Sequence, residues 1–395
     1  MYKWPPHMPD LGDAVKKYID AGKPLSISDD KGIYRELEEK FAALHGRNYA
    51  LLCSSGTVAL FSAYFALDLR EGDEIICTAV SFHATASPAL FFKANIVFCD
   101  VESDTGNIDV TLIENLITEK TRAVVTNDQW GHPCDKKKIL ELCRKNNLKY
   151  IEDCSHAHFA RYEDKFVGSF GDIACWSFQG SKMLNGGEGG ILLTNDFSVY
   201  ERAVLFGHYS WRAINTVRTE KYLPINATGF GLKFRMHPLA AVIILHELEN
   251  YVQKWIKART ATLSYFETQL LKYTPLLPMA KKNYVKSMGA WYGFYPRADF
   301  EALNVDKNDF TEYLKKHGLE VKLPTNGILP YLPIFRLNSN GNEFEYKPAT
   351  KRFWSAEKYF KSIIGFPTFS NYETNEIDRY IKHIANYFGN KNRNC

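Results

Sequence analysis

The clearest indication of the fold lies in YALLCSSGTVALFSAYFALDLREGDEIICT, residues 49–78. Its apolar runs Tyr49–Cys53 and Glu74–Thr78 predict two short strands, and the segment that starts at Val58 predicts a helix between them. Strands joined through a helix of this length form βαβ units, in which the strands lie parallel. We therefore expect an α/β fold.

The same alternation continues on both sides of this stretch. Residues 32–45 form a helical pattern with an apolar face made of Tyr34, Leu37, Phe41 and Leu44. Further along, strand-like runs alternate with helical patterns: the strands at residues 96–100, 122–126 and 149–153, the helices at residues 84–93, 110–117 and 136–145. This order predicts a mainly parallel central sheet flanked by helices.

The rhythm changes after residue 170. Strand-like runs at residues 172–178 and 190–194 flank a glycine cluster, and residues 239–272 read as long helices. Strand- and loop-like segments follow at residues 291–295 and in LPTNG, LPYLP and GFPTF, before a closing helix at residues 375–388. We expect a large domain at residues 1–250 and a smaller α+β domain at residues 251–395.

Composition and charge exclude several classes of protein. The 395 residues are 45% hydrophobic and 14% aromatic, which excludes a disordered chain. The net charge of +4 gives no reason to expect a nucleic-acid partner. No apolar run approaches the ~20 residues that span a bilayer, and the first residues have no apolar core of a secretory signal. Eight cysteines without a CxxC pair predict reduced thiols in a cytoplasmic protein.

A first candidate binding segment is Ser55-Gly56-Thr57, between the first strand and its helix. Glycine lets the backbone approach a ligand closely, and the start of a helix offers free N–H groups and the positive end of the dipole. With the Thr57 hydroxyl, these features suit a phosphate. Serine and threonine are also ordinary helix N-caps, so a purely structural role is the alternative.

A second candidate is Asp153, which closes the apolar run in YIEDCSHAH. Ligands of open α/β sheets bind at the carboxyl ends of strands, where a carboxylate can hold a protonated ring nitrogen, a metal or a hydroxyl. Cys154, His156 and His158 alternate, so on a strand they would share one face and suggest zinc. Because no second Cys/His pair with ligand spacing accompanies them, we expect no metal. The alternative for the two histidines is a role in packing or hydrogen bonding, which we expect more for His158 than for His156.

The third candidate lies in SFQGSKMLNGGEGG, residues 177–190, where Lys182 shortly precedes four glycines. A chain that borders a crowded ligand needs glycines, and a lysine removed from water becomes a nucleophile. A pyridoxal phosphate enzyme needs such a lysine, an acid for the pyridinium nitrogen and a phosphate cradle, and the sequence offers a candidate for each. Neither GxxxxGK[ST] nor GxGxxG is present. The alternative is a solvated lysine in a glycine-rich turn.

With these segments together, the chain resembles the DegT/DnrJ/EryC1/StrS family of pyridoxal phosphate-dependent sugar aminotransferases. The resemblance runs through ELEEKFAALHG, SSGTVAL, GDEIICTAVSFHATA and YIEDCSHAHFA to SKMLNGGEGGILLTND, its most specific block, and GLKFRMHPLAA. It is colinear over nearly the whole chain, and loose only in the last 100 residues. It implies the fold-type I architecture of pyridoxal phosphate-dependent transferases.

The resemblance also implies roles for residues. Lys182 would form the internal aldimine with the cofactor and later move a proton, and Asp153 would keep the pyridinium nitrogen protonated. Phe82 stands where the family has an aromatic residue stacked on the ring, and His156 stands where a glutamine commonly contacts the ring hydroxyl. The cofactor phosphate would be held by Gly56, Thr57 and Ser177.

Lys233 and Arg235 lie in the segment that, in the family, reaches the active site of a neighbouring subunit. The common residue at position 233 is asparagine, and a lysine, which acts as a point charge, suits a phosphate at least as well. The resemblance therefore implies a homodimer with shared active sites.

The implied function is transfer of an amino group from L-glutamate or L-glutamine to a keto-sugar, expected to be nucleotide-linked. Related dehydrases carry a histidine at the position of Lys182, so transamination is favoured over dehydration. Gln179 replaces a tyrosine that is common in the family. Two alternatives therefore remain: a cyclitol or other non-nucleotide keto compound as the acceptor, or a lyase reaction. ILPYLPIF stands where the family often has a PLHLQP-like substrate segment, so the pocket is expected to be unusual. A non-catalytic regulatory protein is a remoter alternative.

Overall fold

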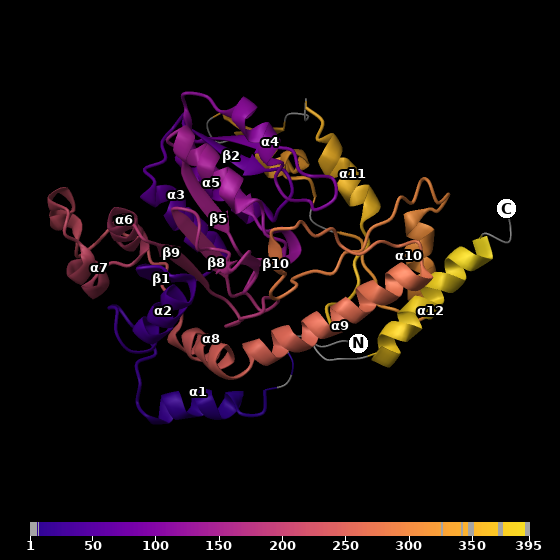
Figure 1. Ribbon diagram of the computed structural model, residues 1–395. Coiled ribbons are helices and arrows are strands. Elements are labelled where there is room, and N and C mark those ends of the chain that lie inside the picture. Colours follow the sequence, from indigo (N-terminus) through magenta and orange to yellow (C-terminus); the bar gives the residue numbers. More distant parts are fainter. Residues whose placement is uncertain are drawn as a thin grey trace.

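The computed structural model describes residues 6, 8–324, 327–340, 343–346, 351–369 and 374–391. Figure 1 shows an α/β body around a central sheet, from which a long helix carries the chain into the C-terminal part. Parts of LPTNG lie outside the described residues, as does Cys395. The seven other cysteines are buried and free. No helix of the described segments is long and apolar enough to cross a membrane.

The central sheet has seven strands in the order β1-β9-β8-β5-β4-β2-β3. Their bounds are β1 Tyr49–Cys53, β2 Glu74–Thr78, β3 Asn95–Cys99, β4 Thr121–Asn127, β5 Lys149–Asp153, β8 Ile173–Ser177 and β9 Gly190–Thr194. Strand β9 runs antiparallel to β1 and to β8, and the other neighbours pair in parallel. The mainly parallel sheet is therefore confirmed.

Helices cover both faces of this sheet because successive side chains of each strand point to opposite sides. Ala123 and Val125 pack in the core under α3 (Gly56–Ala66) and α6 (Phe197–Gly207), whereas Val124 packs on the opposite side against α5 (Lys136–Lys145). On that second face, β1, β8 and β9 are covered by α2 (Gly32–His45) and α8 (Pro238–Asn250). The remaining helices near this body are α1 Leu11–Asp20, α4 Val110–Ile113 and α7 Trp211–Thr216.

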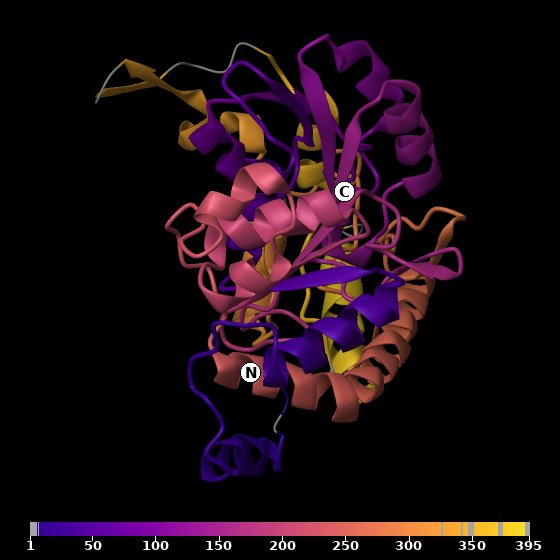
Figure 2. The same ribbon diagram turned by 90° about the vertical axis from the view of Figure 1, so that its left-hand side faces the viewer.

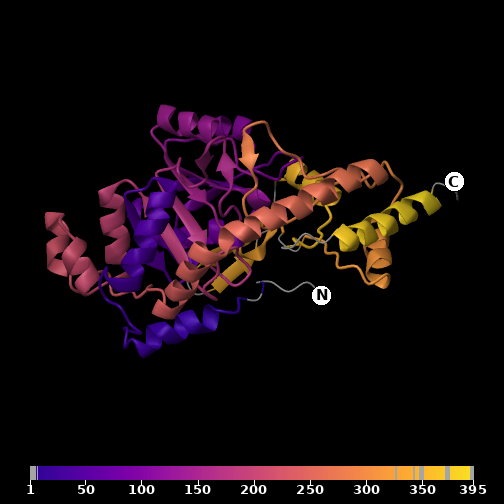
Figure 3. The ribbon, with the colours of Figure 1, turned by 60° about the horizontal axis from the view of Figure 1, so that its bottom comes forward.

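Helix α9, Val252–Tyr273, links the sheet to the C-terminal part. Figures 1 and 3 show α12 (Thr374–Lys391) lying along the far half of α9. A separate hydrophobic core joins α9 and α12 to α10 (Lys307–Lys316) and α11 (Trp354–Ser362). That core also includes residues of the sheet body such as Val80 and Trp130. The division at residue 250 remains a prediction.

Short strands complete the C-terminal part. Strand β10 (Val285–Ser287) pairs with β6 (Arg161–Tyr162), which pairs with β7 (Lys165–Phe166), so the C-terminal part is fastened to the sheet body. Strands β11 (Leu337–Asn340) and β12 (Glu343–Tyr346) form a hairpin that projects from the molecule in Figure 2.

Two predicted helices differ from the structure. Residues 84–93 form two 3₁₀ helices, His83–Thr85 and Ser87–Phe92, because Pro88 removes a backbone donor where an α-helix would continue. Residues 110–117 form the single turn α4 followed by a 3₁₀ turn, Glu114–Leu116. The closing helix is confirmed and is longer than expected, as α12.

Candidate active site

A cavity of about 430 Å³ opens at the carboxyl end of the parallel strands. Its wall is formed by the turn between β1 and α3, the segment after β2, the ends of β4, β5 and β8, and the loop between β8 and β9. It contains seven of the eight expected site residues: Gly56, Thr57, Phe82, Asp153, His156, Ser177 and Lys182. They converge because parallel strands end at one edge of a sheet.

The expected phosphate segment lies at the start of α3. Ser55 caps this helix, since its Oγ accepts the N–H of Val58 at 3.1 Å. The first N–H groups of a helix have no intrahelical acceptor, so they are available to an anion at the cavity wall. Gly56 packs directly on Ser177: a Cβ atom at position 56 would lie 2.7 Å from the Ser177 Cβ. The glycine therefore lets the turn that carries Ser55 and Thr57 meet Ser177 at the end of β8, so that three hydroxyl groups lie near the N-terminus of α3.

Asp153 is held in a fixed orientation. Its Oδ2 accepts the hydroxyl of Thr85 at 2.6 Å, and its Oδ1 accepts the N–H of Ser155 at 3.1 Å. Thr85 is fixed in turn by Ser81, whose hydroxyl lies 2.6 Å from its own. A carboxylate has about four acceptor positions, so Asp153 retains capacity for a further donor, such as a protonated ring nitrogen.

Lys182 lies inside the cavity wall and is only 8% exposed. Its backbone N–H donates to the carbonyl of Gln179 at 2.7 Å, which turns the loop after β8 inward. Its Nζ lies 3.8 Å from the ring centroid of Tyr292. The alternative of a solvated lysine in a glycine-rich turn is therefore wrong.

The histidines after β5 do not share the face of a strand, because β5 ends at Asp153 and the residues after it form turns. The His156 ring is stacked between Tyr292, at 4.1 Å, and Trp130, at 5.3 Å. Burial, reinforced by the charge of Lys182, places the pKa of His156 well below its usual value. The imidazole is therefore neutral, and its buried Nδ1 has no hydrogen-bond partner among the described residues.

His158 serves a structural purpose, as expected. Its Nε2 lies 3.0 Å from the carbonyl oxygen of Ser177, to which it can donate. Burial, with the charge of Lys182, lowers the pKa of His158 to about 3. It is neutral and links the turn after β5 to the end of β8.

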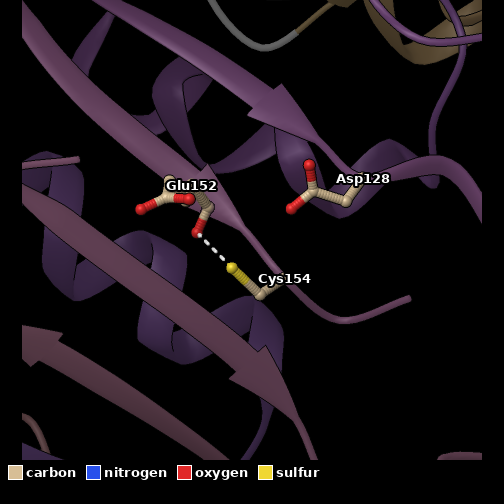
Figure 4. A group of neighbouring side chains, drawn as sticks. All are labelled: Asp128, Glu152 and Cys154. Atoms are coloured by element: carbon tan, nitrogen blue, oxygen red, sulfur yellow. Dashed lines mark hydrogen bonds between the residues drawn. The ribbon is translucent and has the colours of Figure 1, made fainter. Parts of the chain in front are cut away.

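Cys154 belongs to a different cluster. Figure 4 shows it beside Asp128 and Glu152, and its Sγ lies 3.8 Å from the Glu152 backbone oxygen. The two carboxylates face an ammonium group, since Lys136 Nζ lies 2.6 Å from Asp128 Oδ1 and 3.0 Å from Glu152 Oε2. Burial raises the pKa of the Cys154 thiol well above its usual value. The lysine already supplies the positive charge here, so this trio gives the zinc alternative no support.

Lys233 is the one expected site residue outside the cavity wall. It is exposed and pairs through its backbone with His208, in a single antiparallel bridge. Arg235 is turned toward the N-terminal part and donates to the carbonyl of Ile27 at 3.1 Å. This single chain therefore does not bring position 233 to the other site residues.

The cavity also contains residues that the sequence analysis did not predict. Asn127 lies at the end of β4 as the register partner of Asp153, and its buried Oδ1 has no hydrogen-bond partner among the described residues. Its position at a strand end could have indicated it. Tyr292 comes from the C-terminal part, and no local pattern connects it to Lys182. The wall also contains Ser55 and Gln179, which the sequence singled out, and five further residues that it did not: Leu60, Ser81, Ala84, Ser155 and Glu188.

These residues fit pyridoxal phosphate. The volume lies within the roughly 300–1,000 Å³ typical of cofactor sites. A helix N-terminus suits the phosphate, Asp153 the ring nitrogen and Lys182 the aldehyde. The unpartnered polar atoms of Asn127 and His156 are buried groups that a ligand would satisfy.

Comparisons with known proteins agree with this fit. The family model of the DegT/DnrJ/EryC1/StrS aminotransferase family matches residues 27–385. GDP-perosamine synthase of Escherichia coli O157:H7 is 36% identical over 62% of this chain and 66% of that protein. A putative L-glutamine:3-amino-2,3-dideoxy-scyllo-inosose aminotransferase of Micromonospora echinospora is 31% identical over 71% of this chain and 65% of that protein. The alignments span just under two thirds of these two relatives.

The solved structure of an aminotransferase from Psychrobacter cryohalolentis superposes with a TM-score of 0.87. It is 26% identical, and the superposition covers 99% of both chains.

Proposed function

The chain belongs to the DegT/DnrJ/EryC1/StrS family of pyridoxal phosphate-dependent aminotransferases, and from this premise we propose that it transfers an amino group to a keto-sugar. The observation that carries the proposal is a buried lysine, Lys182, in one cavity with Asp153 and the N-terminus of α3. We propose L-glutamate or L-glutamine as the donor and a nucleotide-linked keto-sugar as the acceptor. The names of the two relatives, a GDP-perosamine synthase and an L-glutamine-dependent aminotransferase, support both choices.

Each residue of the cavity would bind a different part of the cofactor. The N-terminus of α3 and the hydroxyls of Thr57 and Ser177 would bind the phosphate. Asp153, fixed by Thr85, would accept a hydrogen bond from the ring nitrogen and hold its proton there. His156, as a neutral imidazole, would hydrogen-bond the ring hydroxyl, and the exposed ring of Phe82 would cover one face of the cofactor.

Bound pyridoxal phosphate supplies an electron sink that makes the carbon next to the amino nitrogen acidic. Lys182 would bond covalently to the cofactor through Nζ and, once released, move a proton between substrate and cofactor carbons. Its burial suits this role because water that reaches the site would compete for the same proton.

A second acceptor class, a cyclitol or other non-nucleotide ketone, rests on Gln179. Its Oε1 accepts the N–H of Ser181 at 2.9 Å and the Ser181 hydroxyl at 2.7 Å. The side chain is thus turned onto its own loop rather than across the cavity, where a bulkier residue would narrow the acceptor space. The name of one relative, an aminotransferase of an inosose derivative, also supports this class of acceptor.

We further propose a cytoplasmic homodimer in which Lys233 of each chain completes the cavity of the other. An exposed large apolar side chain in the segment that follows Phe82 supports an interface there, since Phe91, on the 3₁₀ helix Ser87–Phe92, is 79% exposed. Seven buried free cysteines support a reducing compartment. We also propose that the domain boundary lies between α8 and α9, where Tyr251 separates the two helices.

The test is a visible absorption spectrum of the purified protein with pyridoxal phosphate, before and after addition of L-glutamate and L-glutamine. We expect a yellow band that is absent in Lys182→Ala and is bleached by one donor. Restoration of the band by nucleotide-linked keto-sugars or by inosose-type ketones then identifies the acceptor class. A Lys182→Ala protein that still completes the first half of the reaction at a normal rate would overturn the proposal.

A further inference from the structure

Tyr292 is an aromatic residue of the cavity wall that comes from the C-terminal part of the chain. The centroid of its ring lies 3.8 Å from Nζ of Lys182. Its hydroxyl lies 3.2 Å from the hydroxyl of Ser181, the residue next to that lysine. The phenol thus contacts the loop that carries Lys182 through both its face and its edge.

The ring is held in place by other aromatic groups. Tyr292 stacks on His156 at 4.1 Å with an interplanar angle of 21°, and His156 stacks on Trp130 at 5.3 Å and 8°. Trp130 is anchored by its indole N–H, which donates to the hydroxyl of Tyr359 at 2.8 Å. Offset stacking of this kind favours one orientation of each ring. The face that Tyr292 presents to Lys182 is therefore fixed before any ligand binds.

The backbone that carries Tyr292 is fastened to the turn after β5. The N–H of Ala290 donates to the carbonyl of His158 at 2.8 Å. Gly289 makes this approach possible, because its φ is +55° and a Cβ atom there would lie 2.3 Å from the Ala160 nitrogen. Tyr292 is thus joined to the segment that also holds Asp153 and His156.

We propose that Tyr292 is a positioning residue that receives Nζ of Lys182 whenever this lysine is not bonded to the cofactor, an inference that rests on the proposed function. An ammonium over a tyrosine face is attracted by the ring quadrupole, more strongly where water is excluded. Burial raises the pKa of the Tyr292 phenol, but the charge of Lys182 and the hydrogen bonds of the phenol with Ser181 and with Lys182 outweigh it, so that the pKa lies below its usual value. The Tyr292 ring therefore attracts the Lys182 ammonium, and the charge of Lys182 in turn lowers the pKa of the Tyr292 phenol.

This resting position favours release of the lysine by a donor. In that exchange the nitrogen of a primary amine replaces Nζ at the carbonyl carbon of the cofactor, and two hydrogens pass from the amine nitrogen to Nζ. A further proton from water makes Nζ an ammonium, and nothing is oxidised or reduced. Tyr292 stabilises the released ammonium, so its removal shifts the exchange back toward the lysine-bonded state.

The experiment measures this exchange directly, without turnover. The protein is loaded with pyridoxal phosphate and equilibrated with increasing ethylamine, and borohydride then fixes the cofactor on whichever amine holds it. Intact-protein mass spectrometry gives the fraction of chains with the cofactor on Lys182, and Lys182→Ala identifies any cofactor trapped elsewhere. The ethylamine concentration that halves this fraction is compared among variants.

Tyr292→Leu removes the ring face, and we expect the half-displacement concentration to rise about three- to tenfold. Tyr292→Phe keeps the ring face but loses the hydrogen bond between the phenol and Lys182, and we expect a rise clearly smaller than that in Tyr292→Leu. Tyr273→Leu is the matched control, since Lys272 Nζ lies 5.0 Å from that ring at the end of α9 and outside the cavity wall. Tyr292→Met replaces the leucine variant if the latter does not fold.

An unchanged half-displacement concentration in Tyr292→Leu, with the cofactor trapped normally, would overturn this inference and leave the proposed function intact. Equal effects of phenylalanine and leucine would also overturn it, because the hydroxyl and not the ring face would then be responsible. If the unmodified protein traps no cofactor on Lys182, the proposed function fails and the inference with it.

Discussion

Gly56 at the start of α3 lies so close to Ser177 at the end of β8 that a Cβ on Gly56 would be 2.7 Å from the Ser177 Cβ and 2.9 Å from its Cα. Backbone cannot give way as the end of a flexible side chain can. The start of α3 and the end of β8 therefore approach at a distance that only glycine permits, beside the proposed phosphate site.

The first prediction follows from this contact. Gly56→Ala should weaken pyridoxal phosphate binding at least about tenfold and lower the free energy of unfolding by about 1–3 kcal/mol, because the extra methyl overpacks the turn. Fluorescence titration and urea unfolding measure the two effects. Gly12→Ala is the control, since a Cβ there meets nothing within 4 Å. Equal cofactor affinity in Gly56→Ala and the unmodified protein would contradict the role of this turn.

A second prediction concerns Asp153 and the residue that orients it. Asp153→Asn should lower the rate of donor conversion about 100-fold or more, because a neutral amide no longer stabilises the proton on the ring nitrogen. Thr85→Val removes the hydroxyl that donates to Oδ2 of Asp153 at 2.6 Å, and should lower the rate of donor conversion about tenfold. Single-turnover spectra with a saturating donor measure both rates. A Thr85→Val effect as large as that of Asp153→Asn would mean that Thr85 does more than orient the carboxylate.

The third prediction concerns the buried carboxylates of Asp128 and Glu152, drawn in Figure 4, and Lys136, which contacts both. Lys136→Met leaves Asp128 and Glu152 without the ammonium that both contact and should lower the free energy of unfolding by about 3–5 kcal/mol. The neighbouring Lys137→Met removes an exposed pair with Glu163 and should cost less than about 1 kcal/mol. Urea unfolding at neutral pH compares them, and similar costs would mean that the buried pairs add little.

A fourth prediction is a pH dependence from Glu247, on α8 beneath the Lys182 loop. Its Oε2 accepts the backbone N–H of Asn185 at 2.7 Å. Burial raises the pKa of Glu247 to about 8, against the opposing effect of this hydrogen bond. The folded state thus binds a proton that the unfolded state releases near pH 4.5. Stability from this group is present below pH 4.5 and is lost as the pH rises toward 8.

Glu247→Gln should remove this loss, which we expect to be on the order of 2–4 kcal/mol across the window. Urea unfolding from pH 5 to pH 9 measures it, with Glu249→Gln, an exposed side chain on the same helix, as the control. Parallel pH profiles of Glu247→Gln and the unmodified protein would show that Glu247 is ionised in the folded state.

The last prediction tests the shared site. Lys233→Ala should weaken cofactor binding, and the difference from the unmodified protein should shrink at high salt because a lysine–phosphate contact is screened. Mixing Lys182→Ala with Lys233→Ala chains should restore activity, since one site of each mixed dimer then contains both lysines. Size-exclusion chromatography with light scattering checks the oligomer. A monomer, or mixed chains that remain as inactive as the separate variants, would contradict the dimer.

The pattern of apolar residues predicted the alternation of strands and helices, and with it the mainly parallel sheet. The sequence also indicated Asp153, Lys182 and the Ser55-Gly56-Thr57 turn. Each of these signals is local: apolar periodicity shows which residues are buried, and strand ends converge at one edge of a parallel sheet. That is why seven expected site residues lie in one cavity although they span residues 56–182.

The remaining features come from packing between elements that are distant in the sequence. In its helical segment Lys136 is one of several lysines, and nothing in the sequence sets it apart. In the structure its charge is compensated by two carboxylates, one on β5 and one just after β4. Cys154 alternates with His156 and His158 in the sequence, but β5 ends at Asp153 and these side chains lie in different surroundings. Tyr292 reaches Lys182 from 110 residues further along the chain, through a glycine turn and an aromatic stack. Such contacts depend on how distant elements pack, and no periodicity within a short window encodes them.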